Sequence, residues 1–135
     1  MNKFIIYTDG GARGNPGPAG IGAVLYNEQR EIVAEVSEYL GIATNNQAEY
    51  KAVIFALHKA KELKGEELEF YLDSELVVKQ LNHEYKVKNK DLAPLFLQVY
   101  NLAFNFKKIT YTHIPREQNK EADALANKAM DAGDK

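Results

Sequence analysis

The stretch KFIIYTD, residues 3–9, decides the fold expected for this chain. Its β-branched and aromatic residues predict a strand, and the glycine- and proline-rich stretch 10–20 that follows predicts a turn region. The runs GIGAVLYN at 20–27 and EIVAEVSEYL at 31–40 flank a short polar gap and predict two further strands. We therefore expect the chain to begin with an antiparallel meander of three strands.

After Thr44 the spacing of apolar residues becomes that of a helix. Apolar side chains recur three or four residues apart, with lysines on other faces. The apolar positions are Val53, Ala56, Leu57, Ala60 and Leu63. This pattern predicts an amphipathic helix that ends near Gly65.

Predicted strands and helices alternate in the rest of the chain. ELEFYLD at 67–73 predicts a strand, and SELVVKQL at 74–81 predicts a short helix capped by Ser74 or Asp73. KKITYTHI at 107–114 predicts the last strand. A strand between two helices favours parallel crossover connections.

Two more helices are predicted from capping residues and apolar stripes. Asp91 can cap a helix with Pro94 in its first turn, where the missing N–H group is harmless. Asn119 is the predicted cap of a closing helix. We expect one domain over 1–131, followed by a frayed polar tail at 132–135.

Composition describes a single compact domain. The 135 residues are 45% hydrophobic and 27% charged, which allows a real core, and the lack of cysteine excludes disulfides and thiolate sites. The first apolar run is too short for a signal sequence or a membrane span. We therefore expect a cytoplasmic protein, monomeric and without a membrane partner.

Net charge argues only weakly against a polynucleotide partner. The formal charge of −2 lacks the basic excess that is typical of nucleic-acid-binding proteins. Four carboxylates that held two divalent cations would reverse the sign of this charge.

Four acids are predicted to meet at one edge of the sheet. Asp9 and Asp73 each end a predicted strand, and parallel neighbours would place both carboxylates at the same edge. Glu49 and Asp123 fall in the first turns of two helices, whose positive dipole ends favour acids. Hard oxygen donors of this kind suit Mg²⁺ or Mn²⁺, and two such ions can clamp a phosphodiester.

Each of these signals, taken singly, also has a structural interpretation. Asp9 before two glycines can open a turn, and the Asp73–Ser74 pair can cap a helix. Thr44 and Gln47 fit a capping box, which satisfies backbone N–H groups without any substrate. The combination of the four acids, rather than any one of them, favours phosphoryl chemistry.

Four sequence blocks resemble type 1 ribonuclease H. They are YTDGGARGNPGPAGIGAVL from Tyr7, TNNQAEYKAVIFAL from Thr44, LDSELVVKQL from Leu72 and HIPREQNKEADALANKA from His113. Each block carries one of the acids, the blocks stand in the order of the family, and the match runs almost from end to end.

The resemblance implies an α/β fold and a reaction. The ribonuclease H fold has a five-stranded mixed sheet with helices on both faces. The family hydrolyses the RNA strand of RNA/DNA hybrids with two Mg²⁺ ions, for which Mn²⁺ can substitute, and leaves 5′-phosphate and 3′-hydroxyl ends. By position in the blocks, the metal ligands are Asp9, Glu49, Asp73 and Asp123.

The resemblance also implies residues that contact substrate or assist the reaction. His113 corresponds to a histidine on the loop before the last helix, where a neutral imidazole can help proton transfer or product departure. The minor-groove contacts correspond to Gly10, Gly11, Asn45, Asn46 and Gln47. A pocket for a phosphate of the DNA strand corresponds to Thr44 and Asn89.

The stretch between the second and third predicted helices departs from many bacterial members. LNHEYKVKNKDL replaces their basic protrusion, and only Lys86, Lys88 and Lys90 remain, as a weak phosphate track or as a solvated face. Because the first strand begins at Lys3, we also expect no separate N-terminal hybrid-binding module. Two alternatives stay open: a broader substrate range that includes RNA/RNA duplexes, and a non-catalytic hybrid-binding module.

Overall fold

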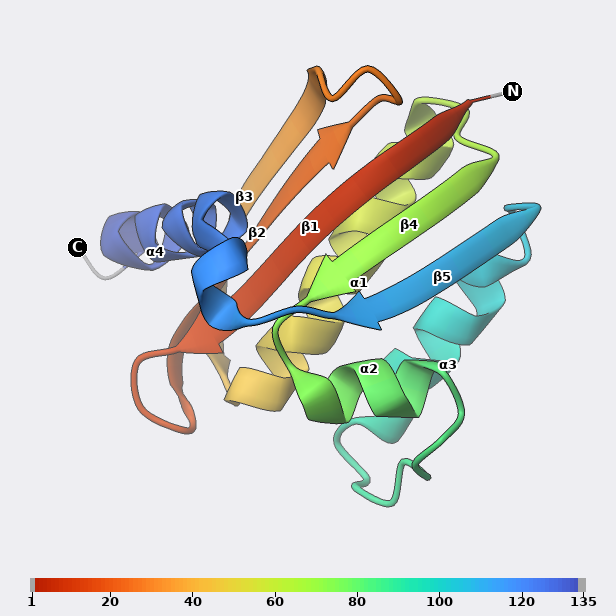
Figure 1. Ribbon diagram of the computed structural model, residues 1–135. Helices are drawn as coiled ribbons and strands as arrows, with labels where there is room; N and C mark the ends of the chain where they lie inside the picture. Colours follow the sequence, from red (N-terminus) through yellow and green to blue (C-terminus); the bar gives the residue numbers. More distant parts are fainter. Residues whose placement is uncertain (1, 134–135) are drawn as a thin grey trace.

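A computed structural model describes residues 2–133 and contains one five-stranded sheet in the order β3-β2-β1-β4-β5 (Figure 1). The strands are β1 (Lys3–Ala12), β2 (Gly17–Tyr26), β3 (Ile32–Ala43), β4 (Glu67–Leu72) and β5 (Lys108–His113). The helices are α1 (Asn45–Glu62), α2 (Glu75–Leu81), α3 (Ala93–Ala103) and α4 (Lys120–Gly133), with a 3₁₀ turn, η1 (Arg116–Gln118), before the last.

The topology confirms the predicted mixed sheet. β1, β2 and β3 form an antiparallel meander, whereas β1 pairs in parallel with β4, and β4 with β5. α1 packs on β1 and β2 from one side and also contacts α3, while α4 covers β1, β2 and β3 from the other side (Figure 1). The sheet therefore has helices on both faces, as the family resemblance implies.

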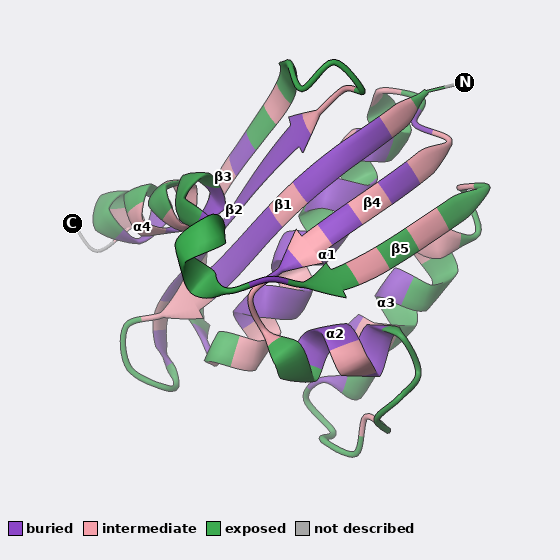
Figure 2. Ribbon diagram, in the orientation of Figure 1, coloured by how far each residue is buried: buried purple, intermediate pink, exposed green. Residues whose placement is uncertain are grey.

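The core lies mainly between the sheet and α1 (Figure 2). Ile6 and Phe70 on neighbouring strands and Tyr50 and Leu57 on α1 are fully buried. The Tyr50 hydroxyl donates a 2.7 Å hydrogen bond to Gln80 Oε1, so the polar end of this large side chain is satisfied inside the core. This core fixes the position of α1 against β1.

The predicted start of α1 is confirmed, and the capping box is present. Thr44 Oγ1 accepts the Gln47 N–H at 3.1 Å, and Gln47 Oε1 accepts the Thr44 N–H at 2.9 Å. Ser74 caps α2 by accepting the Val77 N–H at 3.4 Å, as one of the two expected caps. These local signals were sufficient because each cap and its partner are three residues apart.

The prediction of a turn across 10–20 is wrong for most of that stretch. β1 continues to Ala12 and β2 begins at Gly17, which leaves only 13–16 between the strands. Two of the glycines in these strands serve close packing instead of turning. A Cβ at Gly10 would collide with the Ala48 carbonyl of α1, and one at Gly22 would collide with the Ala122 carbonyl of α4.

The predicted cap of α3 is wrong, whereas Asn119 has the predicted position directly before α4, where its backbone carbonyl accepts the Asp123 N–H at 3.1 Å. Leu92, not Asp91, is the N-cap of α3, and no side chain caps it, although Pro94 lies in the first turn as expected. Asn119 directs its side-chain amide to the sheet, where Nδ2 donates to the Thr8 carbonyl at 2.8 Å. Asn119 Oδ1 is buried and accepts no hydrogen bond among the described residues, so this side chain does not cap α4.

The predicted tail is in part helical. α4 continues through Gly133, so the first two residues of the stretch 132–135 belong to it, and 134–135 lie outside the described residues. In the part of the chain that the structure describes, no helix has the length and apolar character that a membrane span requires.

Gly22→Ala is expected to lower the free energy of unfolding by about 2–3 kcal/mol, because the backbone of α4 blocks the added methyl group. Gly11→Ala is the matched control, since its Cβ would meet no atom closer than 3.9 Å, and we expect a change within about 1 kcal/mol. Urea unfolding followed by circular dichroism measures both. Equal losses in the two variants would contradict this account of the β2–α4 contact.

Candidate active site

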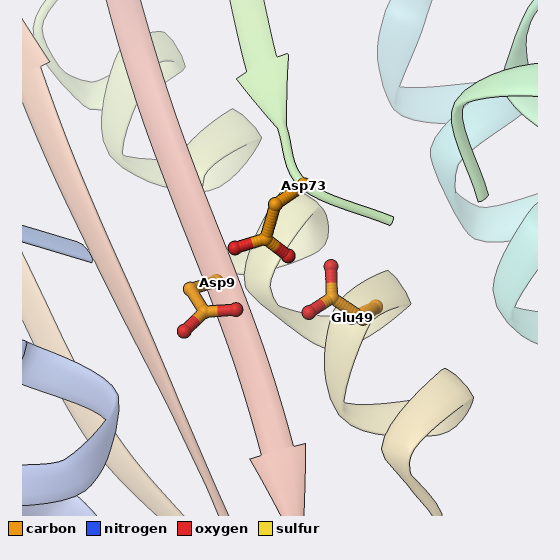
Figure 3. Close-up of side chains that lie close together, drawn as sticks. All are labelled: Asp9, Glu49 and Asp73. Atoms are coloured by element: carbon orange, nitrogen blue, oxygen red, sulfur yellow. The ribbon is translucent and has the colours of Figure 1, made fainter. Parts of the chain in front are cut away.

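Three carboxylates from three different elements meet at one edge of the sheet (Figure 3). Asp9 lies on β1, Glu49 on α1, and Asp73 directly after β4, and one oxygen atom from each lies within 4.8 Å of the others. Asp9 is 8% exposed and Glu49 is 6% exposed. The three acids therefore form a compact and largely desolvated group.

Strand register brings Asp9 and Asp73 together. β1 does not end at Asp9 as expected, because Asp9 is a paired residue opposite Gly22 of β2. The last parallel pair between β1 and β4 joins Thr8 to Leu72, so the next residue of each strand is an acid. The prediction that these two carboxylates lie close together is confirmed. The cause is the register of the parallel strands β1 and β4, and not that both strands end at the acids.

Glu49 is anchored to the strand that carries Asp9. The backbone N–H of Gly10 donates a 3.0 Å hydrogen bond to Glu49 Oε1. Because Gly10 has no side chain, α1 can approach β1 closely enough for this bond. The other oxygen, Glu49 Oε2, is buried and has no hydrogen-bond partner among the described residues.

The electrostatics of the group favour a bound cation. Burial raises the pKa of Asp9 to about 7, and the neighbouring Asp73 carboxylate adds to the rise. Burial and then the Asp9 charge raise the pKa of Glu49 well above its usual range. A divalent cation would supply a partner for Glu49 Oε2 and remove the mutual repulsion, so the donor set fits Mg²⁺ or Mn²⁺.

Asp123 lies at the same edge but outside this compact group. It stands in the first turn of α4, as expected, and its carboxylate adds to the rise in the pKa of Asp9. Arg116 approaches Asp123 Oδ1 at 3.9 Å from the exposed turn before α4. β1, the residue after β4, and the amino-terminal parts of α1 and α4 thus bring all four acids into one cleft.

An open cleft of about 570 Å³ contains the four acids. Gly10, Gly11, Asn45 and Asn46, all expected to contact substrate, line it as well. Its lining also includes residues that the sequence did not single out, namely Ala12, Arg13, Ser74, Arg116, Asn127 and Met130. Cationic, amide and acidic groups therefore face the same opening.

Four other expected site residues lie outside the lining of this cleft. Thr44 and Gln47 form the capping box, which confirms the structural interpretation of this pair. Asn89 is in the exposed segment before α3, where its Oδ1 accepts the Asp91 N–H at 2.7 Å. His113, expected on a loop, is instead the exposed last residue of β5, paired in register with Leu72.

Sequence reasoning missed Asn119 as a site residue. Its Nδ2 lies 3.2 Å from Asp73 Oδ2, and the residue is fully buried. A polar residue before an amphipathic stripe is typical of a helix cap, so only the burial of Asn119 could have indicated another role. That burial depends on contacts across more than a hundred residues of sequence.

Comparison with known proteins shows the family to which the chain belongs. A family model described as "Reverse transcriptase-like" matches residues 7–129. The Bifunctional protein Rv2228c of Mycobacterium tuberculosis is 47% identical over 131 residues, which cover 96% of this chain and 36% of that protein. This chain thus spans about a third of the length of its mycobacterial relatives. A Ribonuclease H of Polynucleobacter asymbioticus is 35% identical and is matched over 90% of its length by 95% of this chain.

Solved structures give the same result at the level of the fold. The N-terminal RNase H domain of Rv2228c superposes with a TM-score of 0.95 at 46% identity, covering 98% of this chain and 96% of that one. LC11-RNase H1, solved in complex with an RNA/DNA hybrid, superposes with a TM-score of 0.94 at 43% identity, over 98% and 99% of the two chains. From its matching family model and a relative covered over most of its length, the chain belongs to the ribonuclease H family.

Proposed function

We propose that the protein is an endonuclease that hydrolyses the RNA strand of RNA/DNA hybrids and leaves 5′-phosphate and 3′-hydroxyl ends. The observation that carries this proposal is the compact group of Asp9, Glu49 and Asp73 in an open cleft. Membership of the ribonuclease H family and the similarity to LC11-RNase H1, itself solved with a hybrid, support the choice of substrate.

Two Mg²⁺ ions are the proposed cofactors, with Mn²⁺ as a substitute. Asp9, Glu49 and Asp73 would bind these ions, and Asp123, which lines the same cleft, would be a fourth protein ligand. Water and substrate oxygens would fill the remaining coordination positions. When bound, such ions lower the pKa of an attacking water and stabilise the leaving oxygen of a phosphodiester.

The residues proposed to contact substrate retain hydrogen-bond donors. Four of them already use a side-chain oxygen as an acceptor inside the protein: Asn45 Oδ1 accepts the Ala12 N–H, Thr44 Oγ1 the Gln47 N–H, Gln47 Oε1 the Thr44 N–H and Asn89 Oδ1 the Asp91 N–H. The amide –NH₂ groups and the Thr44 hydroxyl hydrogen are left to donate. Phosphates, 2′-hydroxyls and the minor-groove edges of bases all offer acceptors, so this set of donors suits a hybrid.

The backbone at the cleft allows close approach of a sugar and phosphate. Gly11 and Asn46 line the cleft, and Gly11 presents no side chain there.

A role of His113 in proton transfer remains a prediction. Its register partner Leu72 directly precedes Asp73, so His113 lies at the same edge of the sheet as the acids.

Asp9→Asn is expected to reduce cleavage of an end-labelled RNA/DNA hybrid by at least about 100-fold, because one metal ligand loses its charge. EDTA is expected to abolish cleavage by the unmodified protein. Glu38→Gln is the control, since Glu38 is an exposed acid on β3 that does not line the cleft. Cleavage that persists in EDTA, or an unimpaired Asp9→Asn variant, would contradict the metal mechanism.

Parallel reactions on RNA/RNA and single-stranded RNA measure the substrate range. We expect cleavage of the hybrid alone, with 5′-phosphate ends detected by their sensitivity to phosphatase. Comparable rates on RNA/RNA duplexes would favour the broader substrate class. Retention of hybrid in a gel without any cut, in Mg²⁺ and in Mn²⁺, would favour a binding module.

Without divalent cations, the free energy of unfolding is expected to fall as pH rises from about 4 to about 7. The pKa of Asp9 is raised to about 7 in the folded protein, against about 3.9 in an unfolded chain. The folded state therefore binds more protons in this window, and rising pH favours unfolding until the upper value is passed.

Asp9→Asn removes this titration and is expected to stabilise the metal-free protein at pH 8 by about 1–3 kcal/mol. Urea unfolding at pH 5 and pH 8 in EDTA gives the comparison, with Glu38→Gln again as control. Mg²⁺ is expected to stabilise the unmodified protein more than the variant. Metal-free stability that is higher at pH 8 than at pH 5 would contradict the rise in the pKa of Asp9 that burial and the neighbouring Asp73 carboxylate cause.

A further inference from the structure

Asn119 joins the three elements that carry Asp9, Asp73 and Asp123. Its Nδ2 donates to the Thr8 carbonyl of β1 at 2.8 Å and to Asp73 Oδ2 at 3.2 Å. Its backbone carbonyl accepts the Asp123 N–H at 3.1 Å in the first turn of α4. We propose that Asn119 is a positioning residue that orients Asp73 as a metal ligand, an inference that rests on the proposed function.

Asp73 needs such a tether because the sheet does not hold it. The parallel pairing of β4 ends at Leu72 on both sides, with Thr8 of β1 and His113 of β5. Asp73 is half-buried and follows the strand, so pairing within the sheet leaves its side chain free to rotate. The bond from Asn119 fixes one carboxylate oxygen, Oδ2, of a residue that lines the cleft, and so restricts how the whole carboxylate can turn.

Burial makes the amide of Asn119 a rigid donor. The residue is fully buried, and both hydrogens of its –NH₂ group have acceptors, one in the backbone and one in a carboxylate. The 2.8 Å bond to Thr8 fixes the amide plane, because that carbonyl belongs to a central strand. The second hydrogen then points at a defined place, where Asp73 Oδ2 accepts it.

An uncharged hydrogen-bond donor, such as the Asn119 amide, suits a carboxylate that must also bind a metal ion. A lysine or arginine in the same place would orient Asp73 but would also neutralise it and repel a divalent cation. An aspartate would remove both donors and add another charge beside buried acids. An amide holds the carboxylate while leaving its full charge for the metal.

Glu49 is held by a hydrogen bond that does not involve Asn119, so the proposal concerns Asp73 and not Glu49. The Gly10 N–H holds Glu49 Oε1 on the α1 side. Loss of Asn119 should therefore disturb Asp73 and the start of α4 while leaving the Asp9–Glu49 pair in place.

Asn119→Ala tests the role with three readouts on the full chain. We expect kcat on the RNA/DNA hybrid to fall by about 10–100-fold with KM within about threefold, and Mg²⁺ affinity by calorimetry to weaken by about 10–100-fold. We also expect the ratio of Mn²⁺- to Mg²⁺-supported activity to rise by at least about threefold, because Mg²⁺ demands stricter ligand geometry. The assays are run well below the unfolding temperature of the variant.

Ser37→Ala is the matched control. Ser37 Oγ donates a 2.7 Å hydrogen bond to the Leu125 carbonyl, so this variant also removes a contact between the sheet and α4 but touches no acid. It is expected to lower the unfolding temperature and to leave kcat, Mg²⁺ affinity and the cation ratio unchanged. If Ser37→Ala shifts these three readouts as strongly as Asn119→Ala, the role of Asn119 is only structural and the proposal fails.

A folded Asn119→Ala variant whose kcat and Mg²⁺ affinity stay within twofold of the unmodified protein would overturn the proposal. If Asn119→Ala does not fold, Asn119→Ser replaces it, since a hydroxyl can donate to only one of the two acceptors, and the same criteria apply. If the unmodified protein cleaves no hybrid, the proposed function fails, whereas the Mg²⁺ affinities of the variants still decide whether Asn119 orients Asp73.

Discussion

Repulsion between carboxylates in a poorly solvated place is the constraint on which this structure depends. Asp9 and Glu49 are almost fully buried and adjacent, and burial raises the pKa of both. Gathering such charges is unfavourable without a cation, so the fold must hold the acids in place against their own repulsion. The large apolar core between the sheet and α1, together with the Gly10–Glu49 hydrogen bond, supplies that restraint.

Glycines let two helices converge on one strand from opposite faces. Gly10 removes the side chain that would hold α1 away from β1, and Gly22 does the same for α4 on β2. Gly22 is also the register partner of Asp9, so their Cα–Cβ directions share the face on which α4 packs. Acids on helices can therefore reach an acid in the middle of a strand, which a bulkier residue at either glycine would prevent.

Much of the fold could be predicted because it depends on local patterns. The capping box of Thr44 and Gln47, the apolar stripe of α1 and the alternation in the strands all act within a few residues. The five-stranded mixed sheet, which the family resemblance implied and with which the order of these elements agrees, is confirmed. The family resemblance then named the four acids, and the structure brings three of them into one compact group.

The features that could not be predicted depend on contacts between distant elements. Gly10 indicates a turn when only its neighbours in sequence are considered, and Gly22 lies in a predicted strand without any sign of a helix contact. The need for glycine at both positions becomes clear only when α1 and α4 are in place. Asn119 has the local pattern of a cap, but burial turns its amide toward Thr8 and Asp73. The end of β5 at His113 is equally a matter of pairing with β4.

The hydrogen bond between Asn119 and Thr8 spans 111 positions of the sequence, which has a consequence for the order of assembly. During synthesis the amino-terminal meander can form early, but the bond cannot exist until the last helix has left the ribosome. A nascent chain would thus hold Asp9, Glu49 and Asp73 before the segment from Asn119 to Asp123 can reach the sheet. The cluster of acids would be complete only after this late segment has docked on strands that formed much earlier.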